Sequence, residues 1–127
     1  MQTDRRSRSR IASFRYAFSG MGYLLRTQRN AWIHATATVC VTALGAWLAL
    51  DRVEWAVLVL TIGLVWMAEF INTALEATVN LASPDIHPLA KAGKDVGAAA
   101  VLIAAITSIV IGLLILVPRL WNRLLSH

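Results

Sequence analysis

The sequence predicts an all-α integral membrane protein, with an N-terminal amphipathic surface helix followed by three transmembrane helices. Hydrophobic residues make up 57% of the 127 residues, too large a share for a soluble domain of this size. Long apolar stretches alternate with short polar ones, and arginines gather near the N-terminus. The length suits a single membrane domain, residues 1–127.

Three stretches have the composition of membrane spans: residues 31–50, 55–81 and 96–117. Each is close to the roughly 20 residues that a helix needs to cross a hydrocarbon core. Residues 51–54 are too few for anything but the turn of a helical hairpin. Pro84 is expected to end the second span and Pro118 the third, because proline cannot continue the backbone hydrogen-bond ladder.

Residues 1–29 predict a cytoplasmic or interfacial amphipathic helix ahead of the first span. Apolar side chains recur there at spacings of three or four: Ile11, Phe14, Phe18, Met21 and Leu25. The positive charge comes from Arg5, Arg6, Arg8, Arg10, Arg15, Arg26 and Arg29. In a chain this apolar, the net charge of +5 indicates anionic membrane lipids as partners and no nucleic acid.

The distribution of basic residues predicts the orientation in the membrane. The N-terminal segment and the loop at 82–95, with Lys91 and Lys94, are placed in the cytoplasm by the positive-inside rule. The first turn, with one arginine and two acids, is placed outside. Arg119 and Arg123 then also lie outside, against the rule, but the N-terminal and second-loop charges outweigh them.

A stripe of polar side chains follows one face of the second span. At about 100° per residue the stripe contains Glu69, Asn72, Thr73, Glu76 and Asn80. A charged residue at the bilayer centre costs on the order of 2.5–3.5 kcal/mol on insertion scales. Two carboxylates on one face therefore predict a polar site that faces other helices. They are separated by about 10 Å along the helix axis.

The predicted cytoplasmic loop places basic groups beside a carboxylate. Lys91 and Lys94 are one helical turn apart, and Asp95 follows directly. Lysine neutralises phosphate oxygens and a carboxylate can hold a metal, so a phosphorylated ligand suits the loop, although a solvated lysine–aspartate pair is the usual alternative. Gly93 and Gly97 allow close approach of backbone or ligand. No Walker-type glycine loop is present, so any nucleotide site would be unconventional.

Two motifs and their spacing identify a family. They read Glu69-Phe70-Ile71-Asn72-Thr73-Ala74-Leu75-Glu76, and His87-Pro88-Leu89-Ala90-Lys91 followed by Gly93-Lys94-Asp95-Val96-Gly97. Both closely resemble the small prokaryotic diacylglycerol kinase and undecaprenol kinase family, over residues 14–116. The resemblance implies a homotrimer in the bacterial inner membrane, with active sites between subunits. It also implies phosphoryl transfer from ATP, with Mg²⁺, to the hydroxyl of a lipid alcohol.

The resemblance further implies roles for individual residues. Glu69 matches the general base and Asn72 the amide beside it. Glu69 and Ala98 match contacts to the lipid substrate. Glu76 and Gln28 match metal-binding positions. The ATP contacts fall on Tyr16, Gln28, Glu76, Asp85, His87, Lys94 and Asp95.

The chain departs from the family pattern at two of these positions. Gln28 stands where better-known members have a second metal-binding glutamate, and Asn80 where they usually have aspartate. A glutamine carbonyl can bind magnesium but neutralises less charge. The substitutions therefore bear on metal affinity and activity. The nucleotide role of His87 rests on the resemblance alone, and His34 in the first span is expected to bond another helix rather than a ligand.

A small multidrug or ion transporter is the alternative from another functional class, because such proteins cycle protons on a membrane glutamate. It accounts for Glu69 but leaves Glu76, Lys94 and Asp95 unexplained. ATP consumption that depends on a lipid alcohol separates the two. Undecaprenol and diacylglycerol both stay open as substrates, and the motifs are more similar to those of the undecaprenol kinase branch.

Overall fold

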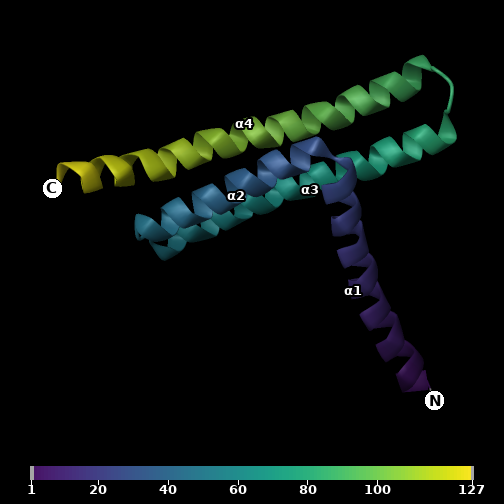
Figure 1. The fold of residues 1–127 in the computed structure, drawn as a ribbon, viewed down its shortest axis with the longest axis horizontal. Helices are drawn as coiled ribbons and strands as arrows, with labels where there is room; N and C mark the ends of the chain where they lie inside the picture. Colours follow the sequence, from purple (N-terminus) through teal and green to yellow (C-terminus); the bar gives the residue numbers. More distant parts are fainter. Residues whose placement is uncertain (1, 127) are drawn as a thin grey trace. The chain divides into compact units, whose positions relative to one another are not determined.

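The computed structural model describes residues 2–126, with side chains from residue 10 onward. In that range the chain forms α1 (Gln2–Thr27), α2 (Arg29–Trp47), α3 (Arg52–Ala82) and α4 (Pro88–Leu125), and no strand (Figure 1). Arg5, Arg6 and Arg8 lie outside the described side chains. The chain divides into two compact units, Met1–Trp32 and Ile33–His127.

The N-terminal unit consists of α1 and the first turn of α2. The apolar side chains of α1 are open to the surroundings: Ile11, Phe14 and Phe18 are 68%, 69% and 68% exposed. Such an open apolar row is what the predicted interfacial helix requires. Gln28 separates the two helices, and its N–H donates to the carbonyl of Leu24 at 2.9 Å.

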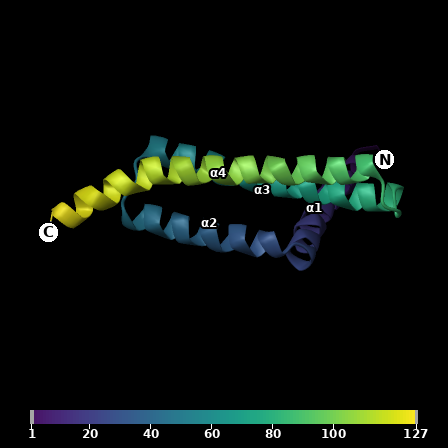
Figure 2. The ribbon, with the colours of Figure 1, turned by 90° about the horizontal axis from the view of Figure 1, so that it is seen from above.

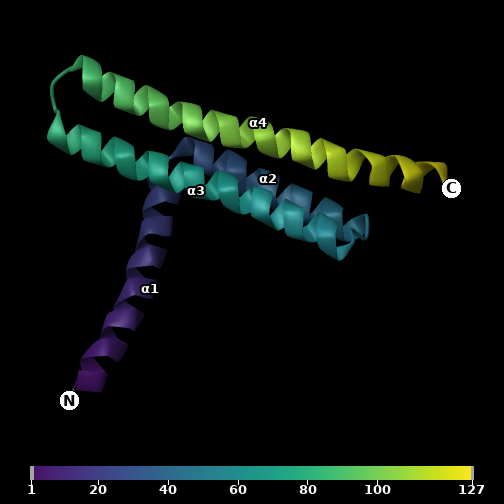
Figure 3. The ribbon, with the colours of Figure 1, turned by 180° about the vertical axis from the view of Figure 1, so that it is seen from behind.

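The second unit holds α3, α4 and the rest of α2. Helices α3 and α4 pack against each other and run antiparallel, joined by the loop at residues 83–87 (Figures 1 and 3). Figure 2 shows α2 beside this pair. Among the described residues α3 and α4 are long and apolar enough to cross a membrane. The first span, predicted at residues 31–50, falls mostly on α2 and stays a prediction.

The hairpin between α2 and α3 turns at residues 48–51, so its prediction at residues 51–54 was misplaced. The N–H of Leu50 donates to the carbonyl of Gly45 and that of Ala49 to the carbonyl of Ala46, both at 3.2 Å. This is the Schellman pattern that ends many helices. Ala49 occupies the left-handed position, with φ 55°, which glycine adopts more easily.

Asp51 is the N-cap of α3, and this is why the polar residues that follow start a helix rather than form a turn. Its Oδ1 accepts the N–H groups of Val53 at 2.9 Å and Glu54 at 3.0 Å. The Glu54 carboxylate in turn accepts the N–H of Asp51 at 2.9 Å, which completes a capping box. The bond from the Glu54 N–H is the main cause that holds the pKa of Asp51 below its ordinary value.

Helix α4 continues through Pro118 to Leu125, so the prediction that this proline ends the third span was wrong. The turns after Pro118 are tied to the α2–α3 hairpin. The side chain of Arg119 donates to Glu54 at 2.8 Å and to Asp51 at 3.1 Å. Arg123 donates to the carbonyl of Trp47 at 2.8 Å.

We call Trp47, Asp51, Glu54, Arg119 and Arg123 the hairpin clamp. Apolar contacts reinforce it, because Leu116 and Leu120 of α4 pack with Leu48, Leu50 and Leu58 of the hairpin. A proline in a helix interior removes a backbone hydrogen bond and costs about 3 kcal/mol or more. The polar and apolar contacts of the hairpin clamp offset this cost. The clamp also gives both arginines a structural role.

At the other end, α3 ends at Ala82 ahead of Pro84, as predicted. Helix α4 begins at Pro88, well before the predicted residue 96. His87 is its N-cap and accepts the N–H of Leu89 through Nδ1 at 3.2 Å, while Pro88 supplies a φ suited to the first helical position. The lysines assigned to a loop therefore lie on the first turns of a helix.

Candidate functional site

The polar stripe of α3 is confirmed, and its burial changes along the helix. Glu69, Asn72 and Thr73 are buried, at 1%, 8% and 6% exposure. Glu76 is half-buried, and Asn80 near the α3–α4 loop is exposed. The stripe thus runs from a buried polar centre to an accessible end.

Glu69 lies at the buried centre of the stripe. Its Oε2 has no hydrogen-bond partner among the described residues. The imidazole Nε2 of His34, on α2, lies 3.7 Å from this oxygen. His34 therefore faces another helix, as predicted, but the separation is longer than a hydrogen bond. A buried carboxylate oxygen left without a bond is costly, and is typical of a site that awaits a ligand.

Asn72 points toward α4. Its amide nitrogen donates to the carboxylate of Glu76 at 3.4 Å, whereas its Oδ1 is buried without a partner among the described residues. Gly97 of α4 faces this oxygen so closely that a Cβ there would collide with it, and would lie 3.0 Å from Cδ2 of Leu75. The predicted close approach is therefore confirmed at Gly97. At Gly93 a Cβ would meet only Val79, at an ordinary 3.9 Å.

An apolar cavity of about 410 Å³ lies between α3 and α4 at the level of Asn72. Its lining is Leu64, Met67, Ala68, Ile71, Asn72, Leu75, Gly97, Ala100, Ile103, Ala104 and Thr107. Asn72 and Thr107 are the polar side chains in this lining. Such a cavity suits an alkyl chain that ends in a hydroxyl group. Ala98 is exposed and is not part of the lining.

A second cavity, of about 270 Å³, lies at the α3–α4 loop. It brings together three of the residues expected to contact ATP: Asp85, His87 and Lys94. Asn80 and Lys91 also border it. Asp95 does not, and instead forms an ion pair with Lys91 one turn away, with both side chains largely exposed. Lys91 and Asp95 therefore form the solvated lysine–aspartate pair considered as an alternative to a ligand site. Lys94 remains available to the loop cavity.

The oxygen donors of the stripe suit magnesium. Glu76 offers a half-buried carboxylate with two oxygens, on the more accessible part of the stripe. Among residues 10–126 no three His, Cys, Asp or Glu side chains come together to hold a metal by themselves. Magnesium is commonly held by one or two carboxylates together with substrate phosphates. The donor set therefore fits an ion that arrives with a nucleotide.

Tyr16 and Gln28 belong to the N-terminal unit, so their expected roles stay predictions from the resemblance. Tyr16 is 72% exposed. Thr107, the second polar group in the wall of the apolar cavity, was not predicted from the sequence. Its signal was present: Gly97, Ala100, Ala104 and Thr107 recur at spacings of three and four, which puts small side chains on one face of α4.

Comparison with known proteins agrees with the motifs. A family described as Prokaryotic diacylglycerol kinase matches residues 15–116. The Undecaprenol kinase of Bacillus subtilis (strain 168) is 44% identical over 108 residues, which cover 85% of this chain and 88% of that protein.

Two relatives named Diacylglycerol kinase are also similar. That of Synechocystis sp. (strain PCC 6803) is 44% identical over 111 residues, 87% of this chain but 63% of that longer protein. That of Escherichia coli (strain K12) is 32% identical over 96 residues, 70% of this chain and 79% of that protein. The resemblance read from the two motifs is confirmed, and the chain belongs to the prokaryotic diacylglycerol kinase family.

Proposed function

We propose that this protein is a membrane lipid kinase that transfers the γ-phosphoryl group of ATP to the hydroxyl of a lipid alcohol. The observation that carries the proposal is the buried, unsatisfied pair Glu69 and Asn72, with Asn72 in the wall of an apolar cavity. Farther along the same two helices, the loop cavity presents Lys94. A lipid kinase needs an apolar acceptor site and a charged donor site of this kind.

In the proposed reaction Glu69 accepts the proton of the lipid hydroxyl as its oxygen attacks the γ-phosphorus. Asn72 holds the hydroxyl in line, and Lys94 neutralises phosphate oxygens. The new bond joins phosphorus to the lipid oxygen, the bond to ADP breaks, and the proton stays on Glu69. Phosphoryl transfer depends chiefly on such positioning and charge neutralisation. The ATP contacts proposed for Asp85 and His87 draw support from their place at the loop cavity.

Glu76 is the proposed magnesium ligand, and the resemblance adds the amide of Gln28. When bound with ATP, magnesium supplies positive charge that neutralises the phosphates. Tyr16 and Asp95 as nucleotide contacts, and Ala98 as a substrate contact, also rest on the resemblance. The exposed position of Asp95, paired with Lys91, leaves it accessible to a nucleotide.

We further infer a multi-pass protein of the bacterial inner membrane, with its N-terminus in the cytoplasm and three spans formed by α2, α3 and α4. A homotrimer with active sites between subunits is part of the same proposal. The membrane location and the trimer draw support from the apolar surface of α4, where Leu102, Ile103, Leu113 and Leu114 are 57–71% exposed. Lipid or another subunit has to cover such a surface.

The proposed substrate is undecaprenol or diacylglycerol, because relatives with each name match this chain at 44% identity. The test is phosphate transfer from labelled ATP in mixed micelles that contain either lipid, with incorporation into the lipid followed over time. Lipid-dependent transfer to at least one of the two is expected, and the faster one identifies the substrate. If neither lipid stimulates ATP turnover, the result would contradict the proposal and favour the transporter alternative.

A further inference from the structure

His34 is the one residue of α2 that forms a charge contact with Glu69 among the described side chains. Its Nε2 lies 3.7 Å from the unsatisfied Oε2 of the glutamate. The side chains at this contact are 15% and 2% exposed, so little water competes for it. The contact joins a titratable donor to the proposed base at a place where both side chains are shielded from solvent.

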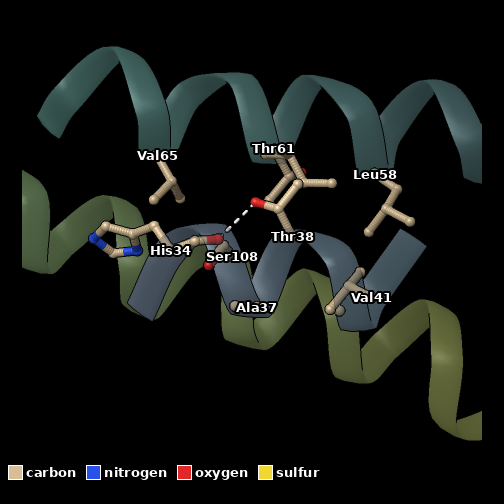
Figure 4. A pocket seen from close by; sticks show the side chains of 10 residues that line it. His34, Ala37, Thr38, Val41, Leu58, Thr61, Val65 and Ser108 are labelled. Atoms are coloured by element: carbon tan, nitrogen blue, oxygen red, sulfur yellow. Dashed lines mark hydrogen bonds between the residues drawn. The ribbon is translucent and has the colours of Figure 1, made fainter. Parts of the chain in front are cut away.

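Neighbouring side chains hold His34 in place from both helices. The hydroxyl of Thr38 donates to the carbonyl of His34 at 2.7 Å, drawn as a dashed line in Figure 4. The indole N–H of Trp66, on α3, donates to the same Thr38 hydroxyl at 3.0 Å. The indole and imidazole rings also meet edge-on, with centroids 6.4 Å apart. The backbone and ring of His34 are thus fixed on the side of the helix that faces Glu69.

A purely structural link between α2 and α3 would be expected to close into a hydrogen bond, because an unsatisfied buried oxygen costs about 1–3 kcal/mol. The distance of 3.7 Å between Nε2 of His34 and Oε2 of Glu69 exceeds the length of a normal hydrogen bond, about 2.9 Å, by less than 1 Å. Catalytic hydrogen bonds are often long in the absence of substrate and tighten when it binds. The geometry therefore suits a contact that closes during the reaction.

We propose that His34 is a positioning residue for the proposed base Glu69. This inference rests on the proposed function. Nε2–H of His34 donates to Oε2 of Glu69 and leaves the other carboxylate oxygen directed at the lipid hydroxyl. During transfer that oxygen takes the hydroxyl proton, so the O–H bond of the lipid breaks as its P–O bond forms. The imidazole fixes the carboxylate and stabilises its charged form before the proton arrives, as the orienting third group does in other nucleophile–base arrangements.

The charged groups that act on Glu69 come from two helices. They are His34 on α2 and Glu76, farther along α3. In the part of the chain that the structure describes, α4 adds no charged group to this set. A variant at His34 therefore changes one of the two charged groups that act on Glu69 and leaves the other in place.

The test uses four variants of the full chain in lipid micelles: His34→Ala, His34→Gln, Glu69→Gln and the double variant His34→Ala with Glu69→Gln. The amide nitrogen of glutamine can reach the place of Nε2 but does not titrate. Thr42→Ala serves as the control, because Thr42 lies on the same helix with an exposed side chain. The readouts are kcat for lipid phosphorylation, KM for ATP and the pH profile of kcat.

His34→Ala should lower kcat by about 10- to 100-fold, as expected for a group that orients a reacting one. KM for ATP should change little, because His34 is assigned no nucleotide contact. His34→Gln should recover a large part of kcat, and its pH profile should differ from that of the unmodified protein because the amide does not titrate. The double variant should be no slower than Glu69→Gln alone, since His34 acts through Glu69.

Two results overturn the inference and leave the proposed function intact. In the first, Glu69→Gln is inactive, but His34→Ala keeps the kcat and the pH profile of the unmodified protein. The other is recovery of activity in His34→Gln with an unchanged pH profile, which would make His34 a packing residue. If Glu69→Gln itself keeps full activity, the assignment of the base fails and His34 loses its proposed role with it.

Discussion

At the residue scale, the two carboxylates of the stripe differ in their surroundings although they share one face of α3. Glu69 is 1% exposed and lies beside His34, whereas Glu76 is half-buried and accepts a bond from Asn72. A buried carboxylate with one oxygen that lacks a hydrogen-bond partner suits proton transfer at lipid depth. A more accessible one suits contact with magnesium and phosphate. The environment, and not the residue type, separates the two proposed roles.

Glu69→Gln should remove nearly all phosphoryl transfer, because the amide keeps the shape of the side chain but cannot accept the proton. General-base catalysis is worth about 10²–10⁴-fold, and a loss in that range is expected. Initial rates at saturating ATP and lipid measure the effect, and size-exclusion chromatography in detergent checks assembly. Retention of more than about a tenth of the activity of the unmodified protein would remove Glu69 from the role of base.

Glu76→Ala should raise the magnesium concentration needed for half-maximal activity far more than it raises the lipid concentration needed. Loss of a carboxylate weakens a site for a hard divalent cation. Titrations of magnesium at fixed lipid, and of lipid at fixed magnesium, separate the two effects. If the magnesium midpoint stays where it is, Glu76 is only a partner of Asn72.

At the element scale, the helices themselves could be predicted from apolar periodicity, but several of their ends could not. Pro118 is a local stop signal, yet α4 continues past it because Arg119 contacts Asp51 and Glu54, 68 and 65 residues away. No local pattern reveals such a partner. The polar stripe was predictable because its period lies within one helix. Its contacts with His34 and Gly97 depend on how three helices pack, which the sequence alone does not specify.

Gly97→Ala should impair activity, because the new Cβ would collide with Oδ1 of Asn72 and crowd Leu75. To avoid this collision, either the side chain of Asn72 must rotate or α3 and α4 must move apart. Both changes displace the Asn72 amide from the apolar cavity. Gly93→Ala is the matched control, since its Cβ would meet Val79 at an ordinary contact distance of 3.9 Å. kcat and thermal stability are measured for both variants. Equal activities would show that α4 can retreat from Asn72 without consequence.

The hairpin clamp should make stability depend on pH through Asp51. Its pKa is lowered in the folded protein, first by the Glu54 N–H and further by the Val53 N–H and Arg119. The stabilisation is therefore complete above the unfolded pKa, about 3.9, and is lost as pH falls through the lower folded value. Asp51→Asn keeps a capping oxygen without the charge. Thermal midpoints measured from about pH 6 down to pH 3 should fall less steeply for this variant than for the unmodified protein.

At the scale of the whole molecule, the second unit has little apolar core of its own. Its buried cluster consists of Leu48, Leu50, Leu58 and Leu116, all near the hairpin clamp. Toward the α3–α4 loop, α4 contacts α3 through Gly97 and small side chains, and most of its apolar surface stays open. Membrane lipid and further subunits would therefore complete the environment of the polar stripe, as the proposed trimer requires.

Mixing two inactive variants tests whether active sites form between subunits. Glu69→Gln disables a residue of α3, and Lys94→Ala one of α4. If one subunit supplies Glu69 and its neighbour Lys94, mixed trimers contain some sites with both groups intact. Random assembly of equal amounts into a ring with one type of interface leaves about one quarter of the sites intact, and activity should approach that fraction.

The competing arrangement keeps the whole site in one chain, and it has support, because Lys94 lines the loop cavity together with Asn80 of the same chain. In that case no chain in the mixture carries both groups, and co-assembly restores nothing. The two proteins should be co-expressed, so that trimers form from both during membrane insertion. A mixture of separately purified and assembled variants is the control, and it should stay inactive unless subunits exchange. Activity that appears only after co-expression would assign Glu69 and Lys94 of each working site to different subunits.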